Sequence, residues 1–374
     1  MKLIVVIVFL TFLFSVRPQT FDCNTLNEQG DRRADKTKFR VCSFNVKFLF
    51  DGINDSSTGS PWDNATVATY HLQNVTKVIE QINCDFLSLY EVEDCSILSR
   101  IIDLLPAGFG YNYYLVKGKD YSTKQQTALL TRVDPVPFNS SVTDALLRTD
   151  YRVWYPVNDS QCGYTGTGSD YGVSKNQYAL FNVGGKEILF VAAHLRAFPT
   201  TAEPCALREA QALVLRNLAE TEGFAKGREI MLMGDLNDYS DAVPDINNDQ
   251  PTSRVLRFLR EGQYGSNNKL INTATKMSQD MRYSAWWDKN SNDVNDFPGE
   301  DTQIDHILFT QNLLNCVENA FIYHSPNLSY PFINYNSDHY PVVIDLDLSK
   351  INAGSLISPI LSFFMICLIL LNLL

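Results

Sequence analysis

Short apolar runs of strand-like character recur along this chain, and five of them end directly in polar residues. The five polar clusters are Phe44-Asn45, Glu91, His194, Gly234-Asp235-Leu236-Asn237 and Ser337-Asp338-His339. A strand holds the residues at its end rigidly at the rim of a sheet, where functional side chains are commonly placed. We therefore expect a sheet-based fold in which the five clusters meet at one active site.

The separation of the first and last clusters sets the size of the domain. A prior of ~150 residues per domain would divide a chain of 374 residues into two or three domains. If Asn45 and His339 serve the same site, however, residues 38–348 form a single domain, which is long enough for a large core. A hydrophobic content of 45% and a charged content of 20% are ordinary for a globular protein.

The periodicity of apolar residues predicts both strands and helices. Between residues 72 and 82 apolar side chains recur at steps of three and four, as in an amphipathic helix, and 204–222 repeats this pattern before Gly223. Further helices are expected at 97–105 and 253–259. Strands are expected at 40–44, 85–90, 113–117, 127–131, 178–183, 187–193, 229–233, 304–309 and 342–348. Strands outnumber helices, and hairpins mix with helical crossovers, which indicates an α/β (α+β) sandwich of two sheets with helices outside.

Apolar segments at both ends have the layout of targeting signals. Lys2 and the apolar run after it resemble a secretory signal over residues 1–19. Small residues around Asn352 and a short spacer precede an apolar run over 360–374, which favours a removed glycosylphosphatidylinositol signal over 353–374, with a plain tail anchor as the alternative. We expect a protein of the secretory pathway, extracellular or lipid-anchored on the outer face of the plasma membrane, with no obligate protein partner.

Glycosylation triplets and cysteines fit that route. Six Asn-x-Ser/Thr triplets begin at Asn54, Asn64, Asn74, Asn139, Asn158 and Asn327. Eight cysteines include one in the C-terminal tail, and an odd number outside it leaves at least one thiol unpaired or intermolecular. A disulfide between Cys162 and Cys205 is favoured because both lie in loop-like stretches, whereas Cys42 is expected to be a buried free thiol inside an apolar strand.

The net charge of −11 argues against a generally basic nucleic-acid binder. Neutralisation of phosphates by Lys and Arg supplies most non-specific affinity for DNA. An acidic chain that acts on phosphates must therefore bind weakly, use a local basic groove, or recruit divalent cations. The acidic clusters favour the last of these.

The polar clusters contain the groups that phosphate-ester hydrolysis requires. The reaction needs a cation for the phosphate oxygens, a base to activate water, and an acid or cation at the leaving oxygen. Hard cations such as Mg²⁺ or Mn²⁺ prefer oxygen ligands, and Asn45, Glu91 and Asp338 are candidate ligands. His339 can serve as the base if a carboxylate fixes its tautomer, and Asp305 is the natural partner.

Together with Ile304-Asp305-His306, the five clusters resemble, in this order, the endonuclease/exonuclease/phosphatase superfamily typified by deoxyribonuclease I, over residues 38–348. The resemblance implies a four-layered α/β-sandwich, a divalent metal, and direct attack of water on a phosphoester. The roles that it implies are metal and phosphate binding by Asn45 and Glu91, contact of His194 with the scissile phosphate, orientation of water and phosphate oxygens by Asp235 and Asn237, and pairing of Asp305 with His339.

Three further residues are candidates for substrate binding. Lys47 falls where the resemblance places a basic residue that contacts phosphate. Trp287, beside Trp286, lies in a segment that resembles an aromatic loop bordering the nucleic-acid groove in exonuclease III-like members, although tryptophans are more often core residues. Lys175 could contact phosphate from the opposite rim, although a lysine at such a position is more often a solvated surface charge.

Two positions depart from the deoxyribonuclease pattern. Gln125 stands where the family carries a Glu that supports the first histidine, so His194 would lack a charged partner. Glu93 stands where deoxyribonuclease-like chains carry a basic residue that touches DNA, and Glu93 also competes with Glu91 as a ligand. The leading hypothesis is a secreted or surface-anchored endonuclease. The alternatives are a phosphatase or sphingomyelinase-like lipid phosphodiesterase of the same fold, and a catalytically weak extracellular matrix protein.

Overall fold

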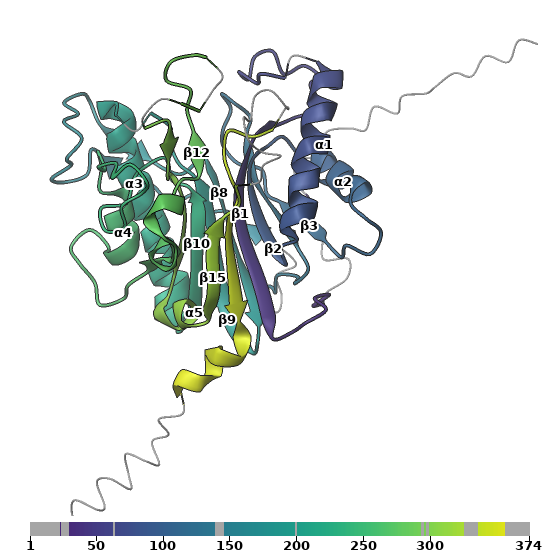
Figure 1. The fold of residues 1–374 in the computed structure, drawn as a ribbon. Helices are drawn as coiled ribbons and strands as arrows, with labels where there is room; N and C mark the ends of the chain where they lie inside the picture. The colour runs from purple at the N-terminus through teal and green to yellow at the C-terminus, as the bar shows by residue number, and fades with distance from the viewer. Residues whose placement is uncertain are drawn as a thin grey trace, which may run out of the picture.

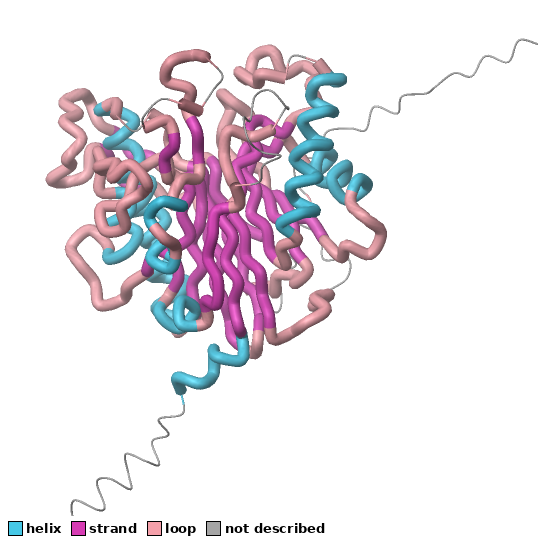
Figure 2. Tube along the Cα trace, in the orientation of Figure 1, coloured by secondary structure: helices cyan, strands magenta, loops and turns pink. Residues whose placement is uncertain are grey.

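The computed structural model describes residues 23, 30–62, 64–138, 146–198, 200–292, 295–296, 299–324 and 336–355. Two six-stranded sheets lie at the centre, and helices lie on the outer sides (Figures 1 and 2). The expected signal at 1–19 and the apolar run at 360–374 lie outside the described residues, as do Asn139 and Asn327. Within the described ranges, none of the helices has the length and apolar character needed to cross a membrane.

Each six-stranded sheet is mixed. The first sheet consists, in spatial order, of β15 (Val317–Ile322), β16 (Val342–Asp347), β1 (Lys38–Leu49), β2 (Phe86–Val92), β4 (Gln126–Thr131) and β3 (Asn112–Leu115). The second consists of β11 (Ile271–Asn272), β14 (Asp305–Phe309), β10 (Glu229–Asp235), β9 (Lys186–His194), β8 (Lys175–Val183) and β5 (Leu146–Leu147). Two small pairs join β6 (Val153–Tyr155) to β7 (Ser169–Tyr171), and β12 (Ala285–Trp286) to β13 (Asp301–Thr302).

The two sheets share one arrangement of strand directions. The pair β1 and β2 runs parallel at the centre of the first sheet, and β9 and β10 run parallel at the centre of the second. Their outer neighbours β16, β4, β14 and β8 run antiparallel to them. Parallel strands carry their carboxyl ends to the same edge, so each sheet brings two strand ends together at one rim.

Side-chain alternation along the strands builds the layers. In β9, Phe190 packs into the core between the sheets, whereas Leu189 and Val191 pack into a second core beneath α3 (Ala202–Leu218). Rings of Phe86 and Phe190, from different sheets, meet edge to face with centroids 4.7 Å apart. The expected α/β-sandwich is thereby confirmed, with one core between the sheets and another under the helices of the second sheet.

The helices form the outer layers. Figure 1 shows α1 (Ala65–Ile82) and α2 (Cys95–Leu104) beside the first sheet, and α3 and α4 (Val255–Glu261) beside the second. The Asn64 side chain begins α1 by accepting hydrogen bonds from the Thr66 and Val67 amides in its first turn, and Asn83 ends the helix at a φ of 46°. Helix α3 starts slightly before the predicted stretch and continues into a π-helical turn at Ala219–Gly223. A short α5 (Gln311–Asn315) follows β14.

Three disulfides join segments of the described chain. They link Cys162 to Cys205, Cys42 to Cys84, and Cys23 to Cys95. The predicted Cys162–Cys205 bridge is confirmed. The prediction of a free thiol at Cys42 is wrong, because the crossover through α1 returns the chain beside β1 and places the two Cα atoms 6.2 Å apart, within disulfide range. Among the described cysteines, the buried Cys316 is free.

Candidate active site

Four of the sequence-predicted residues lie at the carboxyl ends of the two parallel strand pairs. Asn45 and Glu91 belong to β1 and β2, and His194 and Asp235 are the last residues of β9 and β10. His194 and Asp235 are direct partners in the register of β9 and β10. The site is therefore assembled from both sheets.

Local backbone irregularities aim the side chains of the first sheet. Glu91 has a φ of 67°, and the pairing of β2 with β4 shifts register between Tyr90 and Val92, as at a β-bulge. Lys47 and Phe48 also have positive φ angles, of 48° and 49°. The Phe48 amide donates to Glu91 Oε2 at 3.0 Å. These left-handed conformations of non-glycine residues place Glu91 at the site, and strain of this kind clusters at functional positions.

Asn45 connects the carboxylates of the two sheets. Its Nδ2 donates to Glu91 Oε1 at 3.1 Å and to Asp235 Oδ2 at 2.9 Å, while its Oδ1 accepts from the Lys47 amide at 3.0 Å. The Ser337 hydroxyl donates to the Asn45 carbonyl at 2.6 Å. In this arrangement Asn45 orients two acidic groups, and a ligand role for its oxygen requires the amide to turn over.

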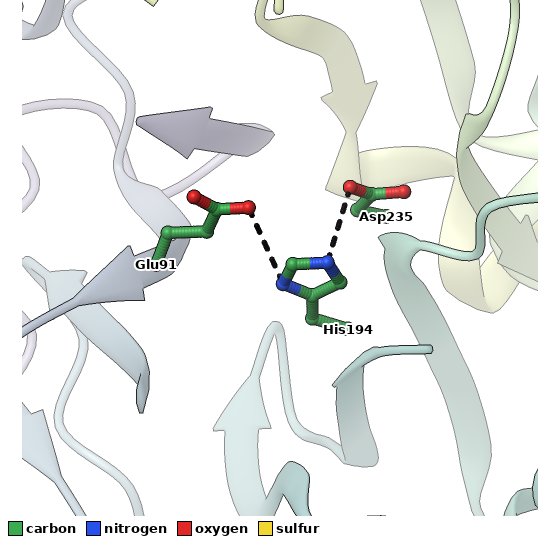
Figure 3. Close-up of side chains that lie close together, drawn as sticks. All are labelled: Glu91, His194 and Asp235. Atoms are coloured by element: carbon green, nitrogen blue, oxygen red, sulfur yellow. Dashed lines mark ion pairs between the residues drawn. The ribbon is translucent and has the colours of Figure 1, made fainter. Parts of the chain in front are cut away.

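His194 lies between two carboxylates, as Figure 3 shows. Its Nδ1 is 3.8 Å from Glu91 Oε1, and its Nε2 is 3.5 Å from Asp235 Oδ2. Burial, followed by the positive charges of Lys175 and His339, lowers the pKa of His194 well below its usual value. The ring is therefore neutral, and its contacts with the acids are polar contacts rather than ion pairs.

His339 and Asp305 form the expected pair, with Nδ1 and Oδ2 2.7 Å apart. Burial lowers the pKa of His339, but the charge and hydrogen bond of Asp305, followed by the charges of Asp235 and Asp338, raise it to about 10. His339 Nε2 faces Asp235 Oδ2 at 3.8 Å. Burial and the nearby charge of Asp305 raise the pKa of Asp235 to about 7. Ser284, which sequence reasoning missed, donates to Asp305 Oδ2 at 2.8 Å.

The turn after β10 fixes Asp235 and Asn237. A Cβ atom at Gly234 would lie 1.9 Å from the Ala193 carbonyl oxygen, so only glycine fits beside β9. The Asn237 amide donates to Asp235 Oδ1 at 3.1 Å, and Asn237 Nδ2 donates to the Leu195 carbonyl at 3.2 Å. The absence of a side chain at Gly234 thus allows the close approach of β10 to β9 that places Asp235 beside His194.

Lys47, Asp338 and Trp287 lie at the rim. Lys47 Nζ is 3.1 Å from Asp338 Oδ2, so the described structure pairs Asp338 with a lysine, and Asp338 is not part of the close clusters of acidic and histidine ligands. Trp287 is 63% exposed, whereas Trp286 is buried. Of the two tryptophans, Trp287 is thus the one that a substrate can reach.

Lys175 lies inside the site rather than on the surface. Its side chain is only 13% exposed, its Nζ donates to Gln125 Oε1 at 2.8 Å, and Asp120 Oδ2 is 3.9 Å away. Burial lowers the pKa of Lys175, although the charge of Glu91 opposes that effect. The alternative of a solvated surface charge is therefore wrong. The Gln125 side chain accepts a hydrogen bond from Lys175. It does not take over the support of His194.

Glu93 is directed away from the catalytic edge. It is 3% exposed, and its Oε2 accepts from the Asp51 amide at 2.8 Å in the loop that follows β1. Of the two glutamates, Glu91 is the one that lies with His194 and Asp235. The buried Glu93 carboxylate therefore bonds to the loop after β1 instead of facing solvent.

The residues present fit a hard divalent cation. Glu91, His194 and Asp235 offer ligand atoms that all lie within 4.8 Å of one another, and Asp235, Asp305 and His339 form an overlapping group. Within the described residues, the buried Nδ1 of His194 has no hydrogen-bond partner. Carboxylates with an imidazole at this spacing suit Mg²⁺ or Mn²⁺.

No protein-family model and no curated protein matches this sequence. Similar solved structures include truncated Caenorhabditis elegans TDP2, at 16% identity and a TM-score of 0.46, covering 83% of this chain and 97% of that one. An endonuclease/exonuclease/phosphatase family protein from Bacteroides thetaiotaomicron shares 18% identity at a TM-score of 0.47, with 83% and 95% covered. The human Nocturnin catalytic domain shares 17% identity at 0.47, with 83% and 94% covered.

Proposed function

We propose that this chain is a divalent-metal-dependent phosphoesterase and that its main substrates are nucleic-acid phosphodiesters, which it cleaves as an endonuclease. The observation that carries the proposal is the convergence of acidic, amide and imidazole groups from both sheets at one buried rim. The converging residues are Asn45, Glu91, His194, Asp235, Asp305 and His339. This is the set of groups that hydrolysis by activated water requires.

The proton acceptor is the pair of His339 and Asp305. Asp305 fixes the ring through Nδ1, which leaves Nε2 directed toward Asp235 and available to a water held there. The negative charges around His339 favour its protonated form. The positive charge of a divalent cation held nearby would oppose that form and leave Nε2 free to accept a proton from water.

Neutral His194 and Lys175 are placed to contact the phosphate. A neutral ring donates from one nitrogen only, and Nε2 faces the same Asp235 oxygen that His339 faces. Lys175 supplies a cation beside the carboxylates. When bound, a divalent cation held by Glu91 would neutralise phosphate oxygens and offset the acidic charges at the site.

A cavity beside Lys175 supports a nucleic-acid substrate. It measures about 250 Å³, and its lining includes Tyr121, Tyr171 and Arg152. Ser174, the neighbour of Lys175, is also part of the lining. Tyrosine rings together with Arg152 suit stacking of a nucleobase. A lipid phosphodiesterase would gain nothing from such stacking.

The disulfides support a secretory route. Three disulfides join the described segments, and disulfides persist in oxidising compartments. We propose that the enzyme acts outside the cytosol, as the expected signals of the sequence indicate.

The test is an activity panel on the purified chain with Mg²⁺ or Mn²⁺ and with EDTA. The substrates are plasmid DNA, RNA, sphingomyelin and a chromogenic phosphodiester. We expect cleavage of a nucleic acid and of the chromogenic diester, and no activity in EDTA. Tyr121→Ala should raise KM for the nucleic acid and leave the chromogenic diester unaffected. Turnover of sphingomyelin alone would refute the nuclease assignment, and no metal-dependent turnover of any substrate would refute the phosphoesterase.

A further inference from the structure

The pairing of β1 with β2 is interrupted next to the active site. The two strands pair up to Asn45 and again at Leu49, and the register shifts between these positions. Lys47 and Phe48 lie in the interruption, and both have left-handed φ angles. Strain at two consecutive residues other than glycine persists only where the surroundings hold the backbone in place. Residues 46–48, called the β1 bulge below, therefore depend on contacts from outside the strand pair.

Side chains of the active site bond to the amides of the β1 bulge. The Lys47 amide donates to Asn45 Oδ1 at 3.0 Å, and the Phe48 amide donates to Glu91 Oε2 at 3.0 Å. Asn45 and Glu91 are also the residues that the proposed function places at the metal. The position of the β1 bulge and the positions of these two side chains are therefore coupled.

Two aromatic side chains bond to the carbonyls of the β1 bulge. His71 Nε2 lies 2.8 Å from the Val46 carbonyl oxygen, and Trp62 Nε1 donates to the Lys47 carbonyl at 3.0 Å. Because a carbonyl oxygen can only accept, Nε2 of His71 carries the proton. The His71 and Trp62 rings stack with centroids 4.2 Å apart and an angle of 26° between their planes. The two donors thus belong to one stacked pair.

The pair is held outside the sheet by the first helix. His71 lies on the buried face of α1 together with Leu72 and Val75, and Trp62 lies in the loop before this helix. Figure 1 shows α1 beside the first sheet. His71 is fully buried and Trp62 is 5% exposed. Displacement of the β1 bulge would stretch both hydrogen bonds in a buried environment, where the loss of a bond is costly.

We propose that His71 and Trp62 are positioning residues, which hold the carbonyls of the β1 bulge and thereby fix Asn45 and Glu91 at the metal site. The inference rests on the proposed metal-dependent hydrolysis. Hydrogen-bond partners that orient metal ligands typically contribute roughly 10–100-fold to metal affinity or activity. His71 and Trp62 act through the β1 bulge, so the lower end of that range is expected.

The test compares two substitutions of His71 with opposite properties. His71→Phe keeps a ring that can stack on Trp62 but removes the donor to Val46, whereas His71→Gln loses the ring and keeps an amide N–H at about the same reach. Binding of Mn²⁺ to the purified chain is measured from the electron paramagnetic resonance signal of the free ion, and Tm is measured without metal. We expect Kd for Mn²⁺ to rise on the order of 10-fold in His71→Phe and to stay within about threefold in His71→Gln.

The order of the two variants separates positioning from packing. His71→Gln should have the lower Tm, because it loses the stacked ring, and yet bind Mn²⁺ more tightly than His71→Phe. If His71 only packs the core, Kd should follow Tm, and His71→Gln should bind Mn²⁺ more weakly. That result would overturn the proposal. Trp62→Phe, which keeps a ring and loses the donor, should raise Kd as His71→Phe does.

Two further variants complete the experiment. Tyr111→Phe removes another buried donor, whose hydroxyl bonds to the Cys84 carbonyl at 2.5 Å at the opposite end of β2 from Glu91, and it should lower Tm without changing Kd. Glu91→Gln should raise Kd because it alters a ligand. A raised Kd in Glu91→Gln with an unchanged Kd in His71→Phe would refute the positioning role and leave the metal site in place. An unchanged Kd in Glu91→Gln would refute the metal site itself, and this inference with it.

Discussion

Replacement of Asp305 by asparagine tests the catalytic pair most directly. The amide keeps the size of the carboxylate and a polar atom near His339 Nδ1, but it removes the charge. Asp305 is fully buried, and its Oδ2 contacts both the His339 ring and the Ser284 hydroxyl. We expect Asp305→Asn to fold with little change in Tm and to lose activity.

The size of the loss follows from the environment of His339. Its surroundings raise the pKa from 6.5 to about 10, which corresponds to about 5 kcal/mol of preference for the protonated ring. Asp305 supplies the largest favourable charge and the hydrogen bond, while Asp235 and Asp338 supply the remainder. Because a positioned base typically contributes 10²–10⁴-fold to the rate, loss of the charge that orients and stabilises this ring should reduce kcat by a factor on the order of 10².

The assay is hydrolysis of a chromogenic phosphodiester in saturating Mg²⁺ across a range of pH. In Asp305→Asn, kcat should fall by about 100-fold, and the acidic limb of the pH profile should move to lower pH because His339 holds its proton less strongly. The substitution of the exposed Asp280, Asp280→Asn, is the matched control and should retain the wild-type kcat and pH profile. A kcat within about threefold of the wild type, with unchanged Tm, would refute the role of this pair.

Four further expectations can be measured with the same protein. Asp235→Ala should reduce kcat by a factor on the order of 10² or more without lowering Tm, because it removes a buried carboxylate whose pKa is raised to about 7. Glu91→Gln should weaken the Mg²⁺ titration of activity, whereas an altered titration in Glu93→Gln alone would reassign the ligand. Burial and neighbouring acids raise the pKa of Glu93 from 4.5 to about 8, so its protonated form stabilises the folded state at low pH. This stability should be lost as pH rises from about 5 to 9 in EGTA, and Glu93→Gln should flatten the decline in Tm. Gly234→Ala should lower the yield of folded protein or Tm sharply, since its Cβ would meet the Ala193 carbonyl, and a normal Tm would contradict the close approach.

The strands and their functional ends were accessible from the sequence because both depend on local patterns. Alternating or continuous apolar residues identify strands, and a polar residue at the end of such a run marks the rim. The predicted strands stopped at Phe44, Tyr90 and Met233, whereas β1, β2 and β10 continue through the polar residues. Asp235 is still paired with His194 in the sheet, since backbone hydrogen bonding does not depend on side-chain polarity.

The direction of the Glu91 side chain and the partners of Lys175 and Cys42 were beyond the sequence. The positive φ at Glu91 turns its carboxylate into the site while Glu93 is directed into a loop, and no local pattern reports that conformation. Burial of Lys175 depends on its contact with Gln125 from another strand. The partner of Cys42 likewise depends on the path of a crossover helix. These features follow from tertiary packing.

Because the active site is divided between two sheets, catalysis depends on how the two sheets pack against each other. Asn45 spans the boundary with hydrogen bonds to Glu91 on one side and Asp235 on the other, so a slide of one sheet by about 1 Å would break one bond of this bridge. Neither half of the chain holds a complete set of groups. Substitutions at the Phe86–Phe190 contact, buried between the sheets, should therefore reduce turnover at temperatures where the protein is still folded. On heating, activity would then be lost at a lower temperature than the fold, because catalysis depends on the spacing between the sheets.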